Sequence, residues 1–266
     1  MLSKNIRFKN FTKKKFNKNL KVLFKKLTNK SSYNDNVVKS FSKSYSYSFT
    51  KKQLKKFKKF NFFQIYGMGG SSLGIQAIYD FMKPKIKKKF YFFDNLDSKN
   101  RIIKTKSKSL NLIISKSGNT LETIVNENIF SGGNKLYITE NNNNYLRNTA
   151  LRLKKEIIEH KNFIGGRYSV LSEVGMLPAE LMGLNSNKFK RFDKLVSNRD
   201  FINSLLTNVN MLYRLVKMGK TNSIILNYDE SSYNLFRWYQ QLVAESLGKN
   251  SKGVLPIISE MPKDNH

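Results

Sequence analysis

The sequence predicts an α/β protein with a three-layer αβα architecture, in which helices cover both faces of a parallel sheet. Short apolar runs typical of buried strands alternate along the chain with longer stretches typical of helices. In addition, glycine- and serine-rich segments follow two of the expected strands. Loops at the carboxyl ends of parallel strands carry the ligand-binding groups of such folds, so these two segments are the first candidates for a site.

The elements are expected in two series, one in each of two subdomains. The first subdomain (51–185) has expected strands at 62–67, 90–94, 110–115 and 135–139 and expected helices at 71–82, 120–130 and 145–159. The second subdomain (186–266) has an expected helix at 200–218, a strand at 223–228, a helix at 232–247 closed by Gly248, and a strand at 253–259. Because the second series stops after two strands, we expect this subdomain to be incomplete.

A basic segment (1–50) precedes the first subdomain, with a helix expected at about 16–27 and no acidic residue before Asp35. An organelle transit peptide is the lesser alternative for it, because such peptides favour arginine and this segment is rich in lysine. We expect a cytoplasmic protein. No apolar run approaches the roughly 18 residues needed to cross a bilayer, so no membrane association is expected.

The net charge of +31 raises the possibility of a nucleic-acid partner. Lysine, asparagine, phenylalanine, tyrosine and isoleucine are abundant together, however, a bias that indicates an A+T-rich coding sequence. No nucleic-acid-binding motif is present, so we expect no dedicated nucleic-acid partner. The chain has no cysteine and only His160 and His266, which argues against thiolate and histidine-rich metal sites. We expect neither a metal nor a cofactor.

The segment SKSGNT (115–120) is the first candidate for chemistry, because it follows a strand and opens a helix. The free N–H groups at a helix start and its dipole favour an anion. Hydroxyl groups add donors and the lysine adds charge, so the segment is suited to phosphate, although an ordinary capped loop has the same composition. GMGGSSLG (67–74) has the same placement. It is not a dinucleotide fingerprint, since Ser72 stands where the third glycine is required.

Two further segments carry charged candidates. GGRYSVLSEVGMLPAELMG (165–183) places Arg167 after two glycines, and arginine is suited to binding oxyanions. In WYQQLVAESLGK (238–249), Gln241 and Glu245 lie four residues apart and therefore share one helix face. We expect this helix to be largely buried and Glu245 to suit a general base. The commoner alternatives are a surface arginine beside a turn and a solvated glutamate.

Taken in order, GMGGSSLG, SKSGNT, GGRYS and QQLVAESLGK resemble the glucose-6-phosphate isomerase family of the sugar-isomerase (SIS) domain superfamily. The resemblance runs from about residue 62 to residue 266. It implies an isomerase that converts glucose 6-phosphate and fructose 6-phosphate through a cis-enediol, usually as a homodimer and without a cofactor. It implies substrate contacts by Gly70, Ser71, Ser115, Lys116, Ser117, Thr120 and Gln241. It also implies Glu245 as the base, Arg167 as the group that stabilises the enediolate, and His266 as the group that assists ring opening.

Members of this family continue well beyond the position of His266, to a C-terminal helix with a catalytic lysine. We therefore expect the sequence to be a fragment, or else a truncated gene product, and the isolated chain to be inactive. The alternatives are a non-catalytic sugar-phosphate-binding protein and an isomerase for another sugar phosphate. The first would not need Glu245 and Arg167, and the GGRYS and AESLGK segments argue against the second.

Overall fold

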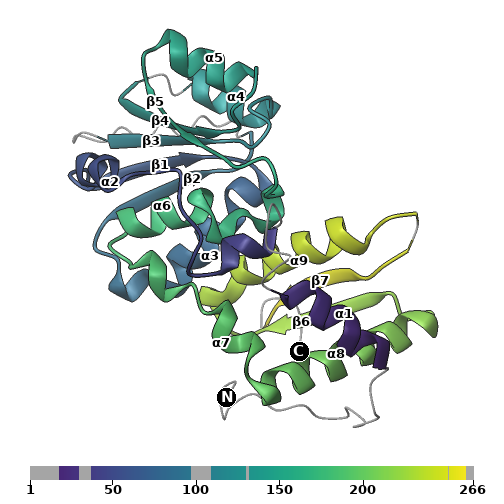
Figure 1. The fold of residues 1–266 in the computed structure, drawn as a ribbon. Coiled ribbons are helices and arrows are strands. Elements are labelled where there is room, and N and C mark those ends of the chain that lie inside the picture. Colours follow the sequence, from purple (N-terminus) through teal and green to yellow (C-terminus); the bar gives the residue numbers. More distant parts are fainter. Residues whose placement is uncertain (1–17, 30–36, 97–108, 130–131, 251, 262–266) are drawn as a thin grey trace.

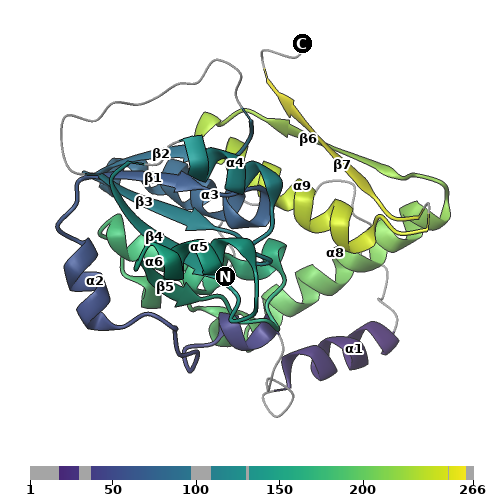
Figure 2. The same cartoon turned by 90° about the horizontal axis from the view of Figure 1, so that it is seen from above.

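The structure, a computed structural model, describes residues 18–29, 37–96, 109–129, 132–250 and 252–261. These residues form two bodies, one above the other in Figure 1. The larger holds a five-stranded sheet and the smaller a two-stranded sheet. Helix α9 (Tyr233–Leu247) joins them, because it packs against α3 (Leu73–Met82) of the larger body and against β7 (Leu255–Glu260) of the smaller (Figure 2).

The larger sheet is parallel throughout and has the strand order β2-β1-β3-β4-β5. Its strands are β1 (Phe62–Tyr66), β2 (Lys89–Phe93), β3 (Ser109–Ile114), β4 (Asn134–Thr139) and β5 (Glu156–Glu159). The first four confirm the strands expected in this part of the sequence. All carboxyl ends lie at one edge of the sheet, from which the loops after β1 and β3 emerge side by side.

Helices cover both faces of this sheet, which confirms the three-layer architecture. α4 (Leu121–Ile129) and α5 (Tyr145–Arg152) lie on one face, and α3 and α6 (Glu173–Leu181) lie on the other (Figure 1). Each face has its own core. The core on the α3 and α6 side is the larger, and α2 (Lys51–Phe57) adds Phe57 to it. The core on the α4 and α5 side is built on Tyr66, Ile113, Tyr137, Leu146 and Ala150.

The expected helix at 145–159 is wrong in its second half. The helix ends at Arg152, the chain turns through Lys154 with a φ of +50°, and β5 follows. The β-branched pair Ile157 and Ile158 lies in this strand, where such residues are favoured. Ile158 is 1% exposed, so its burial against β4 outweighs the helical pattern of the segment. Helices α2 and α6, and the short helix at Phe192–Val196 of the smaller body, were not among the expected elements.

The smaller body follows the predicted order of its elements. It contains α7 (Phe192–Val196), α8 (Arg199–Lys217), β6 (Asn222–Asn227), α9 and β7, and β6 and β7 pair in parallel. The expectation that the helix at 232–247 is largely buried is wrong, because α9 has no fully buried residue. Its neighbours, chiefly α3 and β7, cover only part of its surface.

The N-terminal region contributes α1 (Lys18–Thr28) and the short 3-10 helix η2 (Val37–Phe41). α1 lies against α8 of the smaller body (Figure 2). η2 and the stretch after it are partly buried, with Val38 buried in η2 and Tyr45 buried after it. Within the described part of the chain, no helix has the length and apolar character to cross a membrane.

Candidate active site

The loops after β1 and β3 meet at the carboxyl edge of the larger sheet. The glycine-rich loop begins at Gly67, whose N–H donates to Phe93 O over 3.2 Å. A Cβ atom on Gly67 would lie 3.0 Å from Ile114 O, directly before the SKSGNT segment. The glycine-rich loop thus starts against the last residue of β3, so both loops leave the same edge of the sheet from neighbouring strands.

The 115–120 loop has the features of an anion-binding turn. Ser115 Oγ lies 2.8 Å from Thr120 Oγ1 and accepts a hydrogen bond from Gly118 N over 3.1 Å. Gly118 has a φ of +67°, and a Cβ there would lie 1.8 Å from Asn144 Oδ1, so no other residue fits. Because α4 begins at Leu121, its first N–H groups have no acceptor within the helix and are available to an anion. The hydroxyl of Ser117, an exposed residue, lies on the same turn.

Lys116 differs from the other residues of this loop. Its ammonium group donates to Asn162 O over 2.9 Å and lies 3.4 Å from Glu140 Oε1. These partners direct its charge toward the segments that follow β4 and β5. In this arrangement Lys116 holds the loop in place, and its contact with a substrate stays a prediction.

The glycine-rich loop contacts the two segments that carry the charged candidates. Gly69 has a φ of +53°, and a Cβ on it would lie 2.6 Å from Gln241 Nε2 of α9. A Cβ on Gly70 would lie 2.3 Å from the Gly166 carbonyl carbon and 2.5 Å from Arg167 N, in the 3-10 helix η5 (Gly166–Leu171). Ser71 is buried at the end of the 3-10 helix η3 (Gly69–Ser71). Because Gly69 and Gly70 have no side chains, the loop can approach α9 and η5 closely.

Glu245 is held at both carboxylate oxygens. Arg167 Nη1 donates to Oε2 over 3.2 Å, and Gln241 Nε2 donates to Oε1 over 2.8 Å. The Glu245 side chain is 47% exposed and that of Arg167 is 25% exposed, so the ion pair is accessible to a ligand. The structure thus brings Glu245, Arg167, Gln241 and the glycine-rich loop together, and this loop starts beside the end of β3, from which the 115–120 loop emerges.

Three residues that the sequence reasoning missed fix Arg167. Its Nε donates to Ser246 Oγ over 3.0 Å, and Trp238 Nε1 donates to its carbonyl oxygen over 3.0 Å. Tyr168 lies under the guanidinium, 4.8 Å from ring centroid to Cζ, and its hydroxyl lies 2.6 Å from Ser246 Oγ. The hydrogen bond with Ser246 lowers the pKa of Tyr168, and the hydrogen bond and charge of Arg167 lower it further. The hydrogen bond with Tyr168 and the charge of Glu245 raise the pKa of Arg167. The sequence contains one signal for Ser246, Trp238 and Tyr168: each is adjacent to a predicted site residue or lies on the same helix as one.

Of the two histidines, the structure describes only His160. His266 lies outside the described residues. His160 is fully buried beyond β5, and burial lowers its pKa. Among the residues described by the structure, no group of three histidine, cysteine, aspartate or glutamate side chains is placed to hold a metal ion.

Comparison with known proteins identifies similar sequences. The family profile described as phosphoglucose isomerase matches residues 12–255. A glucose-6-phosphate isomerase of Methanocaldococcus jannaschii is 37% identical over 234 residues, which cover 80% of this chain and 58% of that protein. A probable glucose-6-phosphate isomerase of Methanococcus maripaludis is 32% identical over 79% of this chain and 53% of its own. The chain thus spans a little over half the length of these relatives.

Solved structures support the fold. A hypothetical protein from Thermus thermophilus superposes with a TM-score of 0.73 and 22% identity, over 93% of this chain and 64% of that one. A tagatose-6-phosphate ketose/aldose isomerase from Escherichia coli superposes with a TM-score of 0.53 and 13% identity, over 79% and 60% of the two chains. At these identities the superpositions establish a shared fold and nothing about the substrate.

Proposed function

We propose, because this chain belongs to the phosphoglucose isomerase family, that its carboxyl-edge site serves the interconversion of glucose 6-phosphate and fructose 6-phosphate. The observation that carries the proposal is the pair of hydrogen bonds on Glu245, 3.2 Å from Arg167 and 2.8 Å from Gln241. They orient a carboxylate beside a guanidinium, next to a glycine-rich loop that leaves the same edge of the sheet as the anion-binding turn.

The anion-binding turn would hold the phosphate of the sugar. Ser115, Ser117 and Thr120 supply hydroxyl groups, and the start of α4 supplies N–H groups. Gly70 and Ser71 of the neighbouring loop would close on the same ligand. Binding energy from the phosphate, which does not react, is then available to orient the reacting carbons.

Glu245 would move the proton. Its carboxylate takes the proton from C2 of the open-chain aldose, the C–H electron pair forms the C1–C2 double bond, and the carbonyl π electrons pass to O1. The protonated Glu245 then returns the proton to C1 as the C2 carbonyl forms, and the hydroxyl proton of O2 passes to O1. Arg167, fixed by Ser246 and Trp238, would stabilise the negative oxygen of the cis-enediolate. His266 is proposed for ring opening on the resemblance alone.

The family resemblance also supports a homodimer that works in the cytoplasm, in glycolysis and gluconeogenesis. In the family the histidine at the position of His266 acts across the dimer interface. Sedimentation of the protein at several concentrations measures this association, and a monomer at every concentration would contradict the dimer.

The decisive variant, made in a complete version of the protein, is Glu245→Gln, which keeps the size of the side chain and removes the base. We expect isomerisation to fall by roughly 100-fold to 10,000-fold, the usual contribution of a general base. Incorporation of solvent deuterium at C2 of the substrate should fall with it, and affinity for glucose 6-phosphate should stay within about threefold. Glu230→Gln, an exposed position before α9, is the matched control and should leave all three measurements unchanged.

Two outcomes would contradict the proposal in different ways. Retained deuterium exchange in Glu245→Gln would exclude Glu245 as the base. A complete version of the protein that binds glucose 6-phosphate without turning it over would instead favour the non-catalytic sugar-phosphate-binding alternative.

A further inference from the structure

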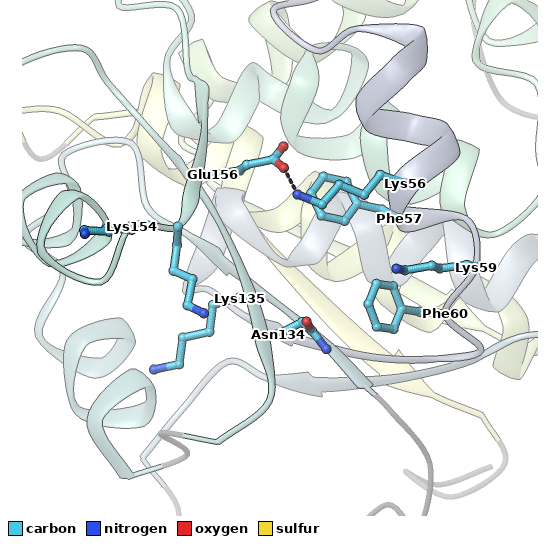
Figure 3. A pocket seen from close by; sticks show the side chains of 9 residues that line it. Lys56, Phe57, Lys59, Phe60, Asn134, Lys135, Lys154 and Glu156 are labelled. Carbon is cyan, nitrogen blue, oxygen red and sulfur yellow. Dashed lines mark hydrogen bonds and ion pairs between the residues drawn. The ribbon is translucent and has the colours of Figure 1, made fainter.

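A second pocket lies at the amino edge of the larger sheet, opposite the edge that carries the candidate active site (Figure 3). It has a volume of about 180 Å³ and lies between α2 and the starts of β4 and β5. We call it the amino-edge pocket. Its lining residues are Lys56, Phe57, Lys59, Phe60, Asn134, Lys135, Lys154, Lys155 and Glu156.

The charges of the amino-edge pocket are strongly unbalanced. Five of its nine lining residues are lysines and one is acidic. That acid, Glu156, is already paired with Lys56, as the dashed line in Figure 3 shows. Lys135 is paired with Glu127, on α4 outside the pocket.

Three ammonium groups of the pocket remain to be neutralised. Within the described residues, Lys59, Lys154 and Lys155 form no ion pair, and all three are exposed. Like charges gathered around one concavity repel each other, and an anion in the pocket would relieve this repulsion.

Lys154 adds a second, independent observation. Its φ of +50° puts it in the left-handed region, where the chain leaves α5. The hydrogen bonds Lys154 N to Leu151 O and Lys155 N to Ala150 O complete a helix C-terminal motif in which this position is usually glycine. A lysine in this conformation is strained where glycine would not be.

We propose that the amino-edge pocket binds a small polyphosphate anion, with Lys59 and Lys155 as cationic ligands. The exposed Lys154 side chain, whose ammonium points away from the pocket in Figure 3, would turn inward to become the third ligand. The volume corresponds to about six water molecules at roughly 30 Å³ each, which suits one or two phosphate groups. The buried rings of Phe57 and Phe60 form its wall. A small concave pocket of this kind suits a compact anion better than the extended backbone of a nucleic acid.

One other role for these lysines has to be separated from binding. α2 and α5 both end at the pocket, and cations near helix C-termini are favoured by the helix dipole. If the lysines serve only the helix ends, their removal should lower stability and leave anion binding unchanged.

The test measures the binding of inorganic pyrophosphate to the full chain by titration calorimetry at 150 mM salt, which screens exposed charges. We expect the triple variant K59A/K154A/K155A to weaken binding at least tenfold. The control K188A/K194A/K220A removes the same charge from exposed positions elsewhere and should change it less than twofold. Equal weakening by both variants would show attraction to net charge alone, and wild type without measurable binding would also overturn the proposal.

Two single changes sharpen the result. Lys154→Gly relieves the left-handed strain, so it should raise the Tm by about 2 °C while weakening pyrophosphate binding. Weaker stability with unchanged binding would indicate a helix-end role and reject the site. Thr120→Val, in the carboxyl-edge loop, should leave pyrophosphate binding at the amino edge in place. If it abolishes all binding, the anion occupies the candidate active site and the proposal fails.

Discussion

Gly70→Ala is the sharpest test of the candidate active site, because one methyl group would intrude between the glycine-rich loop and η5. The added Cβ would lie 2.3 Å from the carbonyl carbon of Gly166 and 2.5 Å from Arg167 N. These are backbone atoms and cannot rotate away. Since ordinary carbon contacts begin near 3.4 Å, the two segments would have to separate by about 1 Å.

This displacement acts on Arg167, whose backbone is one side of the contact. A misplacement of 1 Å in an active site costs about 100-fold in rate, or about 2.7 kcal/mol of transition-state stabilisation. Overpacking should also lower the free energy of unfolding by about 1 to 3 kcal/mol. We therefore expect kcat/KM for fructose 6-phosphate to fall about 100-fold in a protein that still folds.

The assay follows conversion of fructose 6-phosphate to glucose 6-phosphate, with urea unfolding of the same samples. Gly132→Ala is the matched control, because a Cβ there would have no atom within 4 Å. It should retain activity and stability. If Gly70→Ala keeps kcat/KM within threefold of wild type, then close approach of these two segments does not position Arg167, and the reasoning is refuted.

Three further predictions concern the groups around η5. Arg167→Lys removes the planar fork that reaches Glu245 and should lower kcat by about 100-fold to 1,000-fold, with little change in urea midpoint. Tyr45→Phe removes the donor 2.8 Å and 2.9 Å from the two oxygens of buried Glu173, and should cost about 1.5 to 3 kcal/mol in urea unfolding. Burial lowers the pKa of Lys190 from its ordinary 10.5 to about 8. Between these two pKa values the unfolded chain binds more protons than the folded chain, so stability rises with pH. The free energy of unfolding of wild type should therefore rise by about 2 kcal/mol, relative to that of Lys190→Met, from pH 7.5 to 9.5. A difference between the two proteins that does not change with pH would contradict this prediction.

The fold was predictable where apolar runs alternated with helical stretches. β1, β3 and β4 are nearly continuous apolar runs, because strands in a covered parallel sheet are buried on both faces. β5 was missed because EIIE is short and follows a helix without a glycine between them. Its strand state depends on pairing with β4, a contact that no local pattern contains. The burial of α9 also depends on which elements pack against it. The sequence therefore led to an expectation of a largely buried helix, whereas none of its residues is fully buried.

The site was predictable in its parts and not in its contacts. The sequence indicated an anion-binding turn and an acid–base helix, but the Arg167–Glu245 ion pair joins residues 78 positions apart. Nor did it indicate that Lys116 would be held by Asn162 and Glu140. Such contacts arise when η5 and α9 pack against the same glycine-rich loop, and residue spacing carries no information about that.

The position of Arg167 depends on segments on both sides of η5. At its start, Trp238 of α9 donates to the Arg167 carbonyl oxygen. At its end, the buried ammonium of Lys190 donates to Leu171 O and also to Ser40 O in the N-terminal stretch. Burying this ammonium costs free energy, as its lowered pKa shows. Its hydrogen bonds to the two backbone carbonyl groups offset part of that cost. Lys190 therefore joins η2 to the end of η5, the 3-10 helix that carries Arg167, so a substitution that displaces η2 should also shift Arg167.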